Sequence, residues 1–189
     1  MLAGARELPT IGTPRLQLRH IGAADVPALF GIFGDAEVCR YWSHPPLKDL
    51  EAAAEFQRGI ARHFAERTLF QWAIVEREGG AMVGTCTLAS LSAEHRRAEL
   101  GYALARRAWG QGYIAEVLPA IIGFAFDTLA LHRIEADVDP RNARSIGALE
   151  REGFQREGCL RARYHVAGEV QDAVLFGLLQ DEWRPGDRK

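Results

Sequence analysis

A segment with two glycines, Arg-Arg-Ala-Trp-Gly-Gln-Gly-Tyr-Ile-Ala at residues 106–115, constrains the fold more than any other feature of the sequence. Before it, residues 98–104 are typical of a strand. After it, apolar residues recur with the period of a helix over about 112–129, and residues 133–138 resemble a second strand. Strands of one sheet that are connected through a helix usually lie parallel. The sequence therefore predicts a β-α-β unit in the middle of the chain.

Hairpins are predicted on both sides of this unit. Strands at 70–76 and 82–91 flank Glu78-Gly-Gly80, and strands at 159–166 and 170–179 flank Ala167-Gly168. A strand at 16–19 precedes helices that start at Asp25 and Asp49, and a short helix from Asn142 to Glu152 ends before Gly153. We expect an α+β fold, with one β-α-β unit inside a mostly antiparallel sheet.

The length of 189 residues is that of one domain, which we place at 13–184, between a loose N-terminal lead at 1–12 and a short tail at 185–189. Lys+Arg 23 against Asp+Glu 25 gives a net charge of -2, so we expect no nucleic-acid partner and no attraction to an anionic membrane. No apolar run reaches the about 20 residues of a membrane span. The first residues lack a secretory signal pattern, and a cytoplasmic location is expected.

The cysteines and histidines predict no metal site. Cys39, Cys86 and Cys159 are scattered, without a C-x-x-C pair, which fits a reducing compartment and argues against a disulfide scaffold. The six histidines show no paired spacing typical of a metal site.

The glycine segment permits three interpretations. A helix N-terminus presents unpaired N–H groups, and Gly110 and Gly112 would let the backbone approach a phosphate. The same glycines can instead serve only the dihedral angles of a turn. The spacing Gly110-x-Gly112-x-x-Ala115 also fits a dinucleotide fingerprint, with Glu135 or Asp137 as the ribose-binding carboxylate. The flanking hairpins argue against this third interpretation, because dinucleotide folds repeat β-α-β units.

Several segments resemble the GCN5-related N-acetyltransferases (GNAT). Arg107-x-x-Gly110-x-Gly112 is similar to the pyrophosphate loop of that family. Other segments resemble the branch that acetylates the N-termini of ribosomal proteins, and they lie at 13–19, 99–104, 109–113, 139–145, 150–154 and 178–183. The resemblance implies a GNAT-like sheet that is splayed at the central β-α-β unit, with helices on both faces.

The resemblance also implies the activity. An acetyl group would pass from acetyl-CoA to a primary amine by direct attack, with no metal. The expected acceptor is the N-terminal α-amino group of a protein, with a ribosomal protein as a possible partner. A small amine (a polyamine, an amino sugar or an amino acid) is an alternative acceptor, and a CoA-binding module without chemistry is a third hypothesis. Homodimers are common among relatives.

By the same resemblance, one set of residues is expected to bind acetyl-CoA. The backbone of the glycine loop would hold the pyrophosphate, and Leu104 and Arg106 would bond the pantetheine arm through their main chain. Arg106 and Arg107 would offset phosphate charge, although both could be solvated loop residues. The full set is Leu104, Arg106, Arg107, Ala108, Gly110, Gln111, Gly112, Tyr113, Asn142 and Ser145.

Glu99 and Ser145 are the expected catalytic residues. The resemblance implies that Glu99 removes a proton from the acceptor amine and that Ser145 donates a hydrogen bond or a proton to the departing thiolate. Glu94, Glu116 and Asp137 are other candidate bases. Asn142 and Ser145 also have the spacing of a helix cap. Many relatives carry a tyrosine acid one turn after Ser145, where this chain has Leu149.

The acceptor site has the weakest sequence signal. In relatives it is bordered by the loop between the first two helices and by the final hairpin. Arg40, Tyr41, Trp42 and His44 are therefore candidates for binding the acceptor. The alternative is that this aromatic loop only packs against the core.

Overall fold

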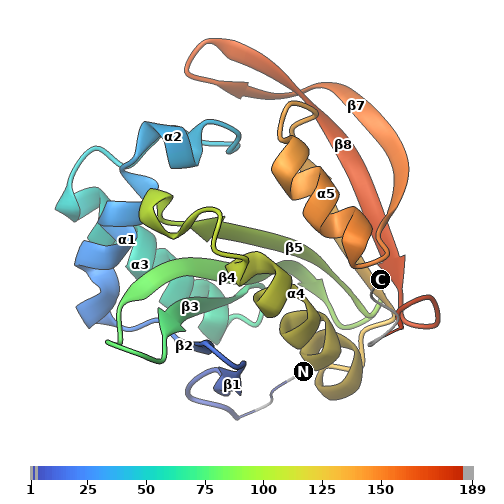
Figure 1. Ribbon diagram of the computed structural model, residues 1–189, viewed down its shortest axis with the longest axis horizontal. Helices are drawn as coiled ribbons and strands as arrows, with labels where there is room; N and C mark the ends of the chain where they lie inside the picture. The colour runs from blue at the N-terminus through green and yellow to red at the C-terminus, as the bar shows by residue number, and fades with distance from the viewer. Residues whose placement is uncertain (1, 3, 185–189) are drawn as a thin grey trace.

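The structure is a computed structural model that describes residue 2 and residues 4–184. Figure 1 shows the arrangement of its helices and strands. The helices are α1 (Val26–Phe33), α2 (Ala36–Cys39), α3 (Leu50–Ala65), α4 (Tyr113–Gly123) and α5 (Ala143–Arg151). The strands are β1 (Ile11–Gly12), β2 (Leu16–His20), β3 (Phe70–Glu76), β4 (Met82–Ser92), β5 (Arg97–Leu104), β6 (Arg133–Val138), β7 (Gln155–Val166) and β8 (Glu169–Leu179).

The strands form one sheet in the order β1-β2-β3-β4-β5-β6-β8-β7. Every neighbouring pair is antiparallel except β5 and β6, the two strands that α4 connects. The parallel pairing joins only Arg97–Glu99 to Arg133–Glu135, although both strands continue beyond it. The predicted α+β fold with a splayed central β-α-β unit is therefore confirmed.

Helices cover both faces of the sheet (Figure 1). One apolar cluster joins the sheet to α4 and α5, and a second joins it to α1, α2 and α3. Alternate residues of a strand point to opposite faces, and along β5 Leu100 packs in the first cluster whereas Ala103 packs in the second. The same alternation places Tyr102 on the α4–α5 face and Glu99 on the α1–α3 face.

Two short elements and two boundaries differ from the sequence prediction. Strand β1, at residues 11–12, was not predicted, and it pairs with β2. The short helix α2, capped by the Asp35 side chain, was not predicted, because four residues are too few to show a helical period. The helix predicted to about 129 ends at Gly123 and continues as a π-helical turn, Phe124–Thr128. Strand β7 starts at Gln155 rather than at the predicted residue 159. The prediction was late because the side chains of this strand are almost all exposed, so its sequence shows no alternation of apolar and polar residues.

The ends of the short helix agree with the prediction. Asn142 caps α5, and Gly153 after it has a φ of 91°. The predicted tail at 185–189 lies outside the described residues. Among the described helices, none is long and apolar enough to cross a membrane.

Candidate active site

The glycine loop follows β5 and leads into α4. Gly110 and Gly112 have φ values of 76° and 75°, in the left-handed region that favours glycine. Gly112 is the N-cap of α4, and no side chain caps this helix. In the part of the chain that the structure describes, the N–H groups of Gly110, Gln111 and Gly112 donate no hydrogen bond. A helix N-terminus with free N–H groups can bind an anion such as a phosphate, so the loop has the features of a phosphate site.

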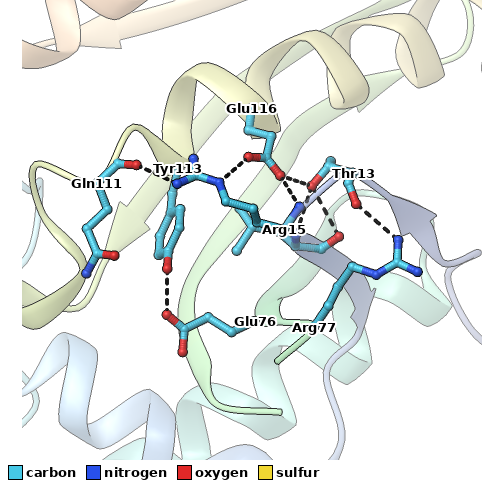
Figure 2. Close-up of polar contacts among 8 residues, drawn as sticks. Thr13, Arg15, Glu76, Arg77, Gln111, Tyr113 and Glu116 are labelled. Atoms are coloured by element: carbon cyan, nitrogen blue, oxygen red, sulfur yellow. Dashed lines mark hydrogen bonds and ion pairs between the residues drawn. The ribbon is translucent and has the colours of Figure 1, made fainter. Parts of the chain in front are cut away.

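Arg15, which precedes β2, fixes this loop from outside (Figure 2). Its Nη1 donates to the Gln111 carbonyl at 3.0 Å, and its guanidinium lies 4.8 Å from the centroid of the Tyr113 ring. The Arg15 backbone N–H and Nε both donate to the Glu116 carboxylate, at 2.7 and 2.8 Å. Thr13 Oγ1 donates to the same carboxylate at 2.5 Å. We call Arg15, Glu116 and Thr13 the loop clamp.

The contacts of the loop clamp were not predicted from the sequence, although its residues were singled out for other reasons. Thr13 and Arg15 belong to one of the segments that resemble the GNAT family, and Glu116 was a candidate base. The structure places Glu116 in the clamp and not in the cavity at Glu99. Tyr113 is also fixed, since its hydroxyl donates to Glu76 Oε1 at 2.7 Å (Figure 2).

Two predicted cofactor residues have other partners. Arg107 Nη2 donates to the Met82 carbonyl at 2.8 Å, so its guanidinium is held against β4. The N–H of Ala108 donates to the Ala105 carbonyl, and the Ala108 side chain is buried. Arg106 is exposed at the start of the same turn. Of the two arginines predicted to offset phosphate charge, Arg106 is therefore the freer.

The backbone of Leu104 faces the gap between β5 and β6. The N–H of Ala105 donates to the Val83 carbonyl of β4, and the peptide groups of a strand point alternately to its two neighbours. The Leu104 N–H is therefore directed away from β4. The Leu104 carbonyl accepts a hydrogen bond from Trp109 Nε1 at 2.9 Å. This geometry agrees with an amide of Leu104 that donates into the splay.

On the other side of the gap, α5 presents Asn142 and Ser145. The Asn142 side chain accepts from the Ser145 N–H at 3.2 Å, as a helix cap does. Ser145 Oγ lies 2.8 Å from the hydroxyl of Tyr102, which comes from β5. Leu149, one turn further along, is buried in the core.

Glu99 lies in a cavity of about 390 Å³ under β7 and β8. The cavity is lined by charged residues from β5, β6 and β7, which are Arg97, Glu99, Arg133, Glu135, Asp137, Glu157 and Arg163. Burial, followed by the negative charges of Asp137 and Glu135, raises the pKa of Glu99 above its ordinary value. A carboxylate of this kind is suited to accept a proton.

The other carboxylates of the cavity are paired. Glu135 binds Arg97 and Arg133 at 2.6 and 2.8 Å, and Glu157 binds Arg133. Asp137 lies 3.7 Å from Arg163 and accepts from the Tyr164 hydroxyl at 2.9 Å. Within the described residues, Glu99 has no ion pair or hydrogen bond from its carboxylate.

The remaining candidate base and the acceptor loop lie elsewhere. Glu94 is exposed in the turn before β5 and does not line the cavity at Glu99. The four residues predicted to bind the acceptor, Arg40, Tyr41, Trp42 and His44, do not line it either.

The aromatic residues of that loop divide between packing and contact with the site. Trp42 packs edge-on against Phe33 and makes a tilted contact with His44, at centroid distances of 5.1 and 5.2 Å. The Tyr41 ring contacts the guanidinium of Arg40 and that of Arg141, the residue before Asn142. Trp42 and His44 are thus part of a packed cluster, whereas Tyr41 reaches the loop before α5.

Comparisons with known proteins agree with this geometry. The profile of the acetyltransferase (GNAT) domain matches residues 15–155. The chain is 34% identical to uncharacterized N-acetyltransferase p20 of Bacillus licheniformis over 93% of this chain and 99% of the relative. It is 37% identical to the ribosomal protein uS5-alanine N-acetyltransferase of Escherichia coli over 46% of this chain and 45% of the relative.

Solved structures show the same fold. Spermidine N-acetyltransferase from Vibrio cholerae in complex with CoA and spermine matches with a TM-score of 0.80 at 21% identity, over 89% of this chain and 97% of that chain. Together with these matches, the free N–H groups of the glycine loop and the splayed parallel strand pair identify a CoA-dependent acyltransferase. The chain belongs to the GNAT family and is an acetyl-CoA-dependent N-acetyltransferase. No group of three or more His, Cys, Asp and Glu side chains that could hold a metal ion occurs among the described residues.

Proposed function

We propose that this enzyme acetylates the N-terminal α-amino group of a protein, of the ribosomal-protein type, in the cytoplasm. The charge balance of the cavity at Glu99 carries the proposal. Four carboxylates in the cavity face three arginines, and Glu99 is the carboxylate without an ion pair among the described residues. An α-ammonium group brings one positive charge, whereas a polyamine brings several and needs an excess of carboxylates.

Glu99 is proposed as the base on the acceptor side. Its raised pKa, caused by burial and by its acidic neighbours, makes it a stronger base than an exposed glutamate. It would take one proton from the incoming ammonium group and leave the neutral amine that attacks the acetyl carbon. The paired arginines hold the neighbouring carboxylates in place and limit further attraction of cations.

The donor side is proposed to work through the backbone. Free N–H groups at Gly110, Gln111 and Gly112 would hold the pyrophosphate, and the Leu104 N–H would donate to the developing oxyanion. Asn142 would bond the pantetheine arm, and Ser145 would donate a hydrogen bond to the departing sulfur. When bound, acetyl-CoA supplies the thioester whose acetyl group is transferred.

The loop at 40–44 is proposed to border the acceptor path. Tyr41 contacts Arg141, and Arg141 also pairs with Asp139 and with Glu169 at the start of β8. These contacts bring the loop, the segment before α5 and the final hairpin together at one place. A peptide N-terminus would enter there, next to Asn142.

A polyamine acceptor is the alternative. The chain shares its fold with an enzyme whose structure holds spermine, and it is 24% identical to the spermidine N(1)-acetyltransferase of Vibrio cholerae over 89% of this chain and 95% of that relative. The similarity to the uS5-alanine enzyme is closer in sequence and favours a protein terminus, although it covers less than half of the chain.

The test measures release of the CoA thiol from acetyl-CoA with a panel of acceptors. The panel contains peptides that begin with Ala, Ser or Met, spermidine, spermine and an aminoglycoside. We expect kcat/KM for one peptide to exceed that for every small amine by at least about tenfold, a difference of about 1.4 kcal/mol in transition-state binding. Preference for spermidine would replace this acceptor with the alternative, and donor binding without any turnover would favour a binding module.

A further inference from the structure

Tyr102 makes a contact that the proposed mechanism does not yet use. Its hydroxyl lies 2.8 Å from Ser145 Oγ and 3.4 Å from the Ser145 carbonyl. The residue stands on β5 beyond Glu99, where the pairing of β5 with β6 has ended. Its side chain thus reaches from the sheet to α5 beside the splay between β5 and β6.

We propose that Tyr102 is a positioning residue that orients the Ser145 hydroxyl toward the departing sulfur. This inference rests on the proposed role of Ser145. Where many relatives carry a tyrosine acid on the helix, this chain has the buried and apolar Leu149, and the tyrosine next to Ser145 comes from the strand.

The proposal requires the Tyr102 hydroxyl to be the donor in its hydrogen bond with Ser145 Oγ. Burial raises the pKa of its hydroxyl to about 12, so the phenol keeps its proton at neutral pH. The groups that face it are Ser145, the buried thiol of Cys86 and the cation of Arg151. Of the described residues, only Ser145 is within hydrogen-bond distance of its hydroxyl, with Oγ at 2.8 Å and the carbonyl oxygen at 3.4 Å, and the proposal has Tyr102 donate along the shorter contact, to Oγ. The proton of Ser145 is then free to point elsewhere.

The arrangement gives a chain of two hydrogen bonds. Tyr102 donates to Ser145, and Ser145 donates to the sulfur, with each bond polarising the next. As the new C–N bond forms, the C–S bond breaks and its electron pair stays on sulfur. The nitrogen loses one proton, and the free thiol gains one. Tyr102 itself gives up no proton, because a phenol with so high a pKa is a weak acid.

The test uses Tyr102→Phe, Ser145→Ala and the double variant. We expect Tyr102→Phe to lower kcat about tenfold, with KM for acetyl-CoA nearly unchanged, since a hydrogen bond made in the transition state is lost. Because Tyr102 acts through Ser145, the double variant should be no slower than Ser145→Ala. Multiplied effects in the double variant would overturn the inference.

A second readout does not depend on turnover. The pKa of the thiol of bound CoA is measured from its thiolate absorbance in the far ultraviolet, with the free variants as blanks. Loss of the donated hydrogen bond should raise this pKa in both single variants by about one unit, equivalent to about 1.4 kcal/mol.

An unchanged thiol pKa in Ser145→Ala sinks the inference even if Tyr102→Phe fails to fold. Absence of turnover with every amine in the panel, together with the expected rise in the thiol pKa, would instead remove the proposed acceptor and leave the role of Tyr102 intact.

Discussion

The two halves of the proposed active site would recognise their substrates by different means. The glycine loop offers backbone N–H groups, and its shape comes from two positive φ values and from the clamp of Arg15 and Glu116. The cavity at Glu99 offers side-chain charges from three strands that are distant in sequence. A donor that many enzymes share can be held by a local backbone motif. An acceptor that differs between enzymes is selected by side chains that vary without changing the fold.

The largest expected effect comes from a change in the glycine loop that leaves the cavity at Glu99 intact. Gly110→Asp/Gly112→Asp places side chains at positive φ and negative charge beside the pyrophosphate. We expect the affinity for CoA, measured by calorimetry, to fall by more than about 100-fold, or about 3 kcal/mol. The matched control is Gly79→Asp/Gly80→Asp in the β3–β4 turn, where φ is also positive. Equal loss in both variants would mean that instability, not the loop, is responsible.

On the acceptor side, Glu99→Gln removes the proposed base and keeps the shape. We expect kcat to fall by about 10²–10⁴-fold, the usual contribution of a general base, while CoA affinity stays the same. Glu94→Gln, at an exposed carboxylate in the turn before the same strand, serves as the control. Retention of full activity in Glu99→Gln would transfer the role of base to another group or to water.

A change in the loop clamp should have a smaller effect, and two donors, with and without a pyrophosphate, can locate it. Arg15→Ala removes the bond to the Gln111 carbonyl and the pairing with Glu116, so KM for acetyl-CoA should rise by about fivefold to tenfold. Turnover with acetyl-pantetheine, which lacks the pyrophosphate, should not change. The control is Arg58→Ala, which removes exposed ion pairs on α3. Parallel losses with both donors would show that Arg15 supports the fold in general.

The smallest expected effect concerns pH. The negative charge of Asp137 raises the pKa of Glu99, so Asp137→Asn should lower it. A base must be deprotonated, so the acidic limb of kcat/KM against pH should move to lower pH in this variant, by less than about one unit. Glu150→Gln, exposed on α5, is the control. A shift to higher pH would contradict the assignment of that limb to Glu99.

The sequence could predict features that local patterns encode. The central β-α-β unit followed from periodicity, and the glycine loop from its residue types at a strand-to-helix junction. The short elements α2 and β1 were missed because four and two residues carry no period. Strand β7 was placed too late, since it lies at the sheet edge with both faces exposed along most of its length.

The contacts that complete the site could not be predicted, because they join distant segments. Ser145 and Tyr102 are 43 residues apart, and Arg15 and Glu116 are 101 apart. The carboxylate without an ion pair could not be identified from the sequence either, because the partners come from other strands. Arg97 pairs with Glu135, and Arg163 pairs with Asp137. From the sequence, Glu99 was one of several candidate carboxylates. The structure distinguishes it from Glu116, which pairs with Arg15, whereas Glu99 lies in the cavity.

The early end of the β5–β6 pairing should affect hydrogen exchange at the backbone amides of β5. Along β5, amides that face β4, such as that of Ala105, donate within the sheet, whereas those of Tyr102 and Leu104 face the gap. Without a donor, exchange with solvent deuterium should therefore be slow and fast at alternate residues of one strand. A pantetheine arm in the gap would accept hydrogen bonds from these amides and slow their exchange. The residues that become protected would therefore show which part of the donor is bound.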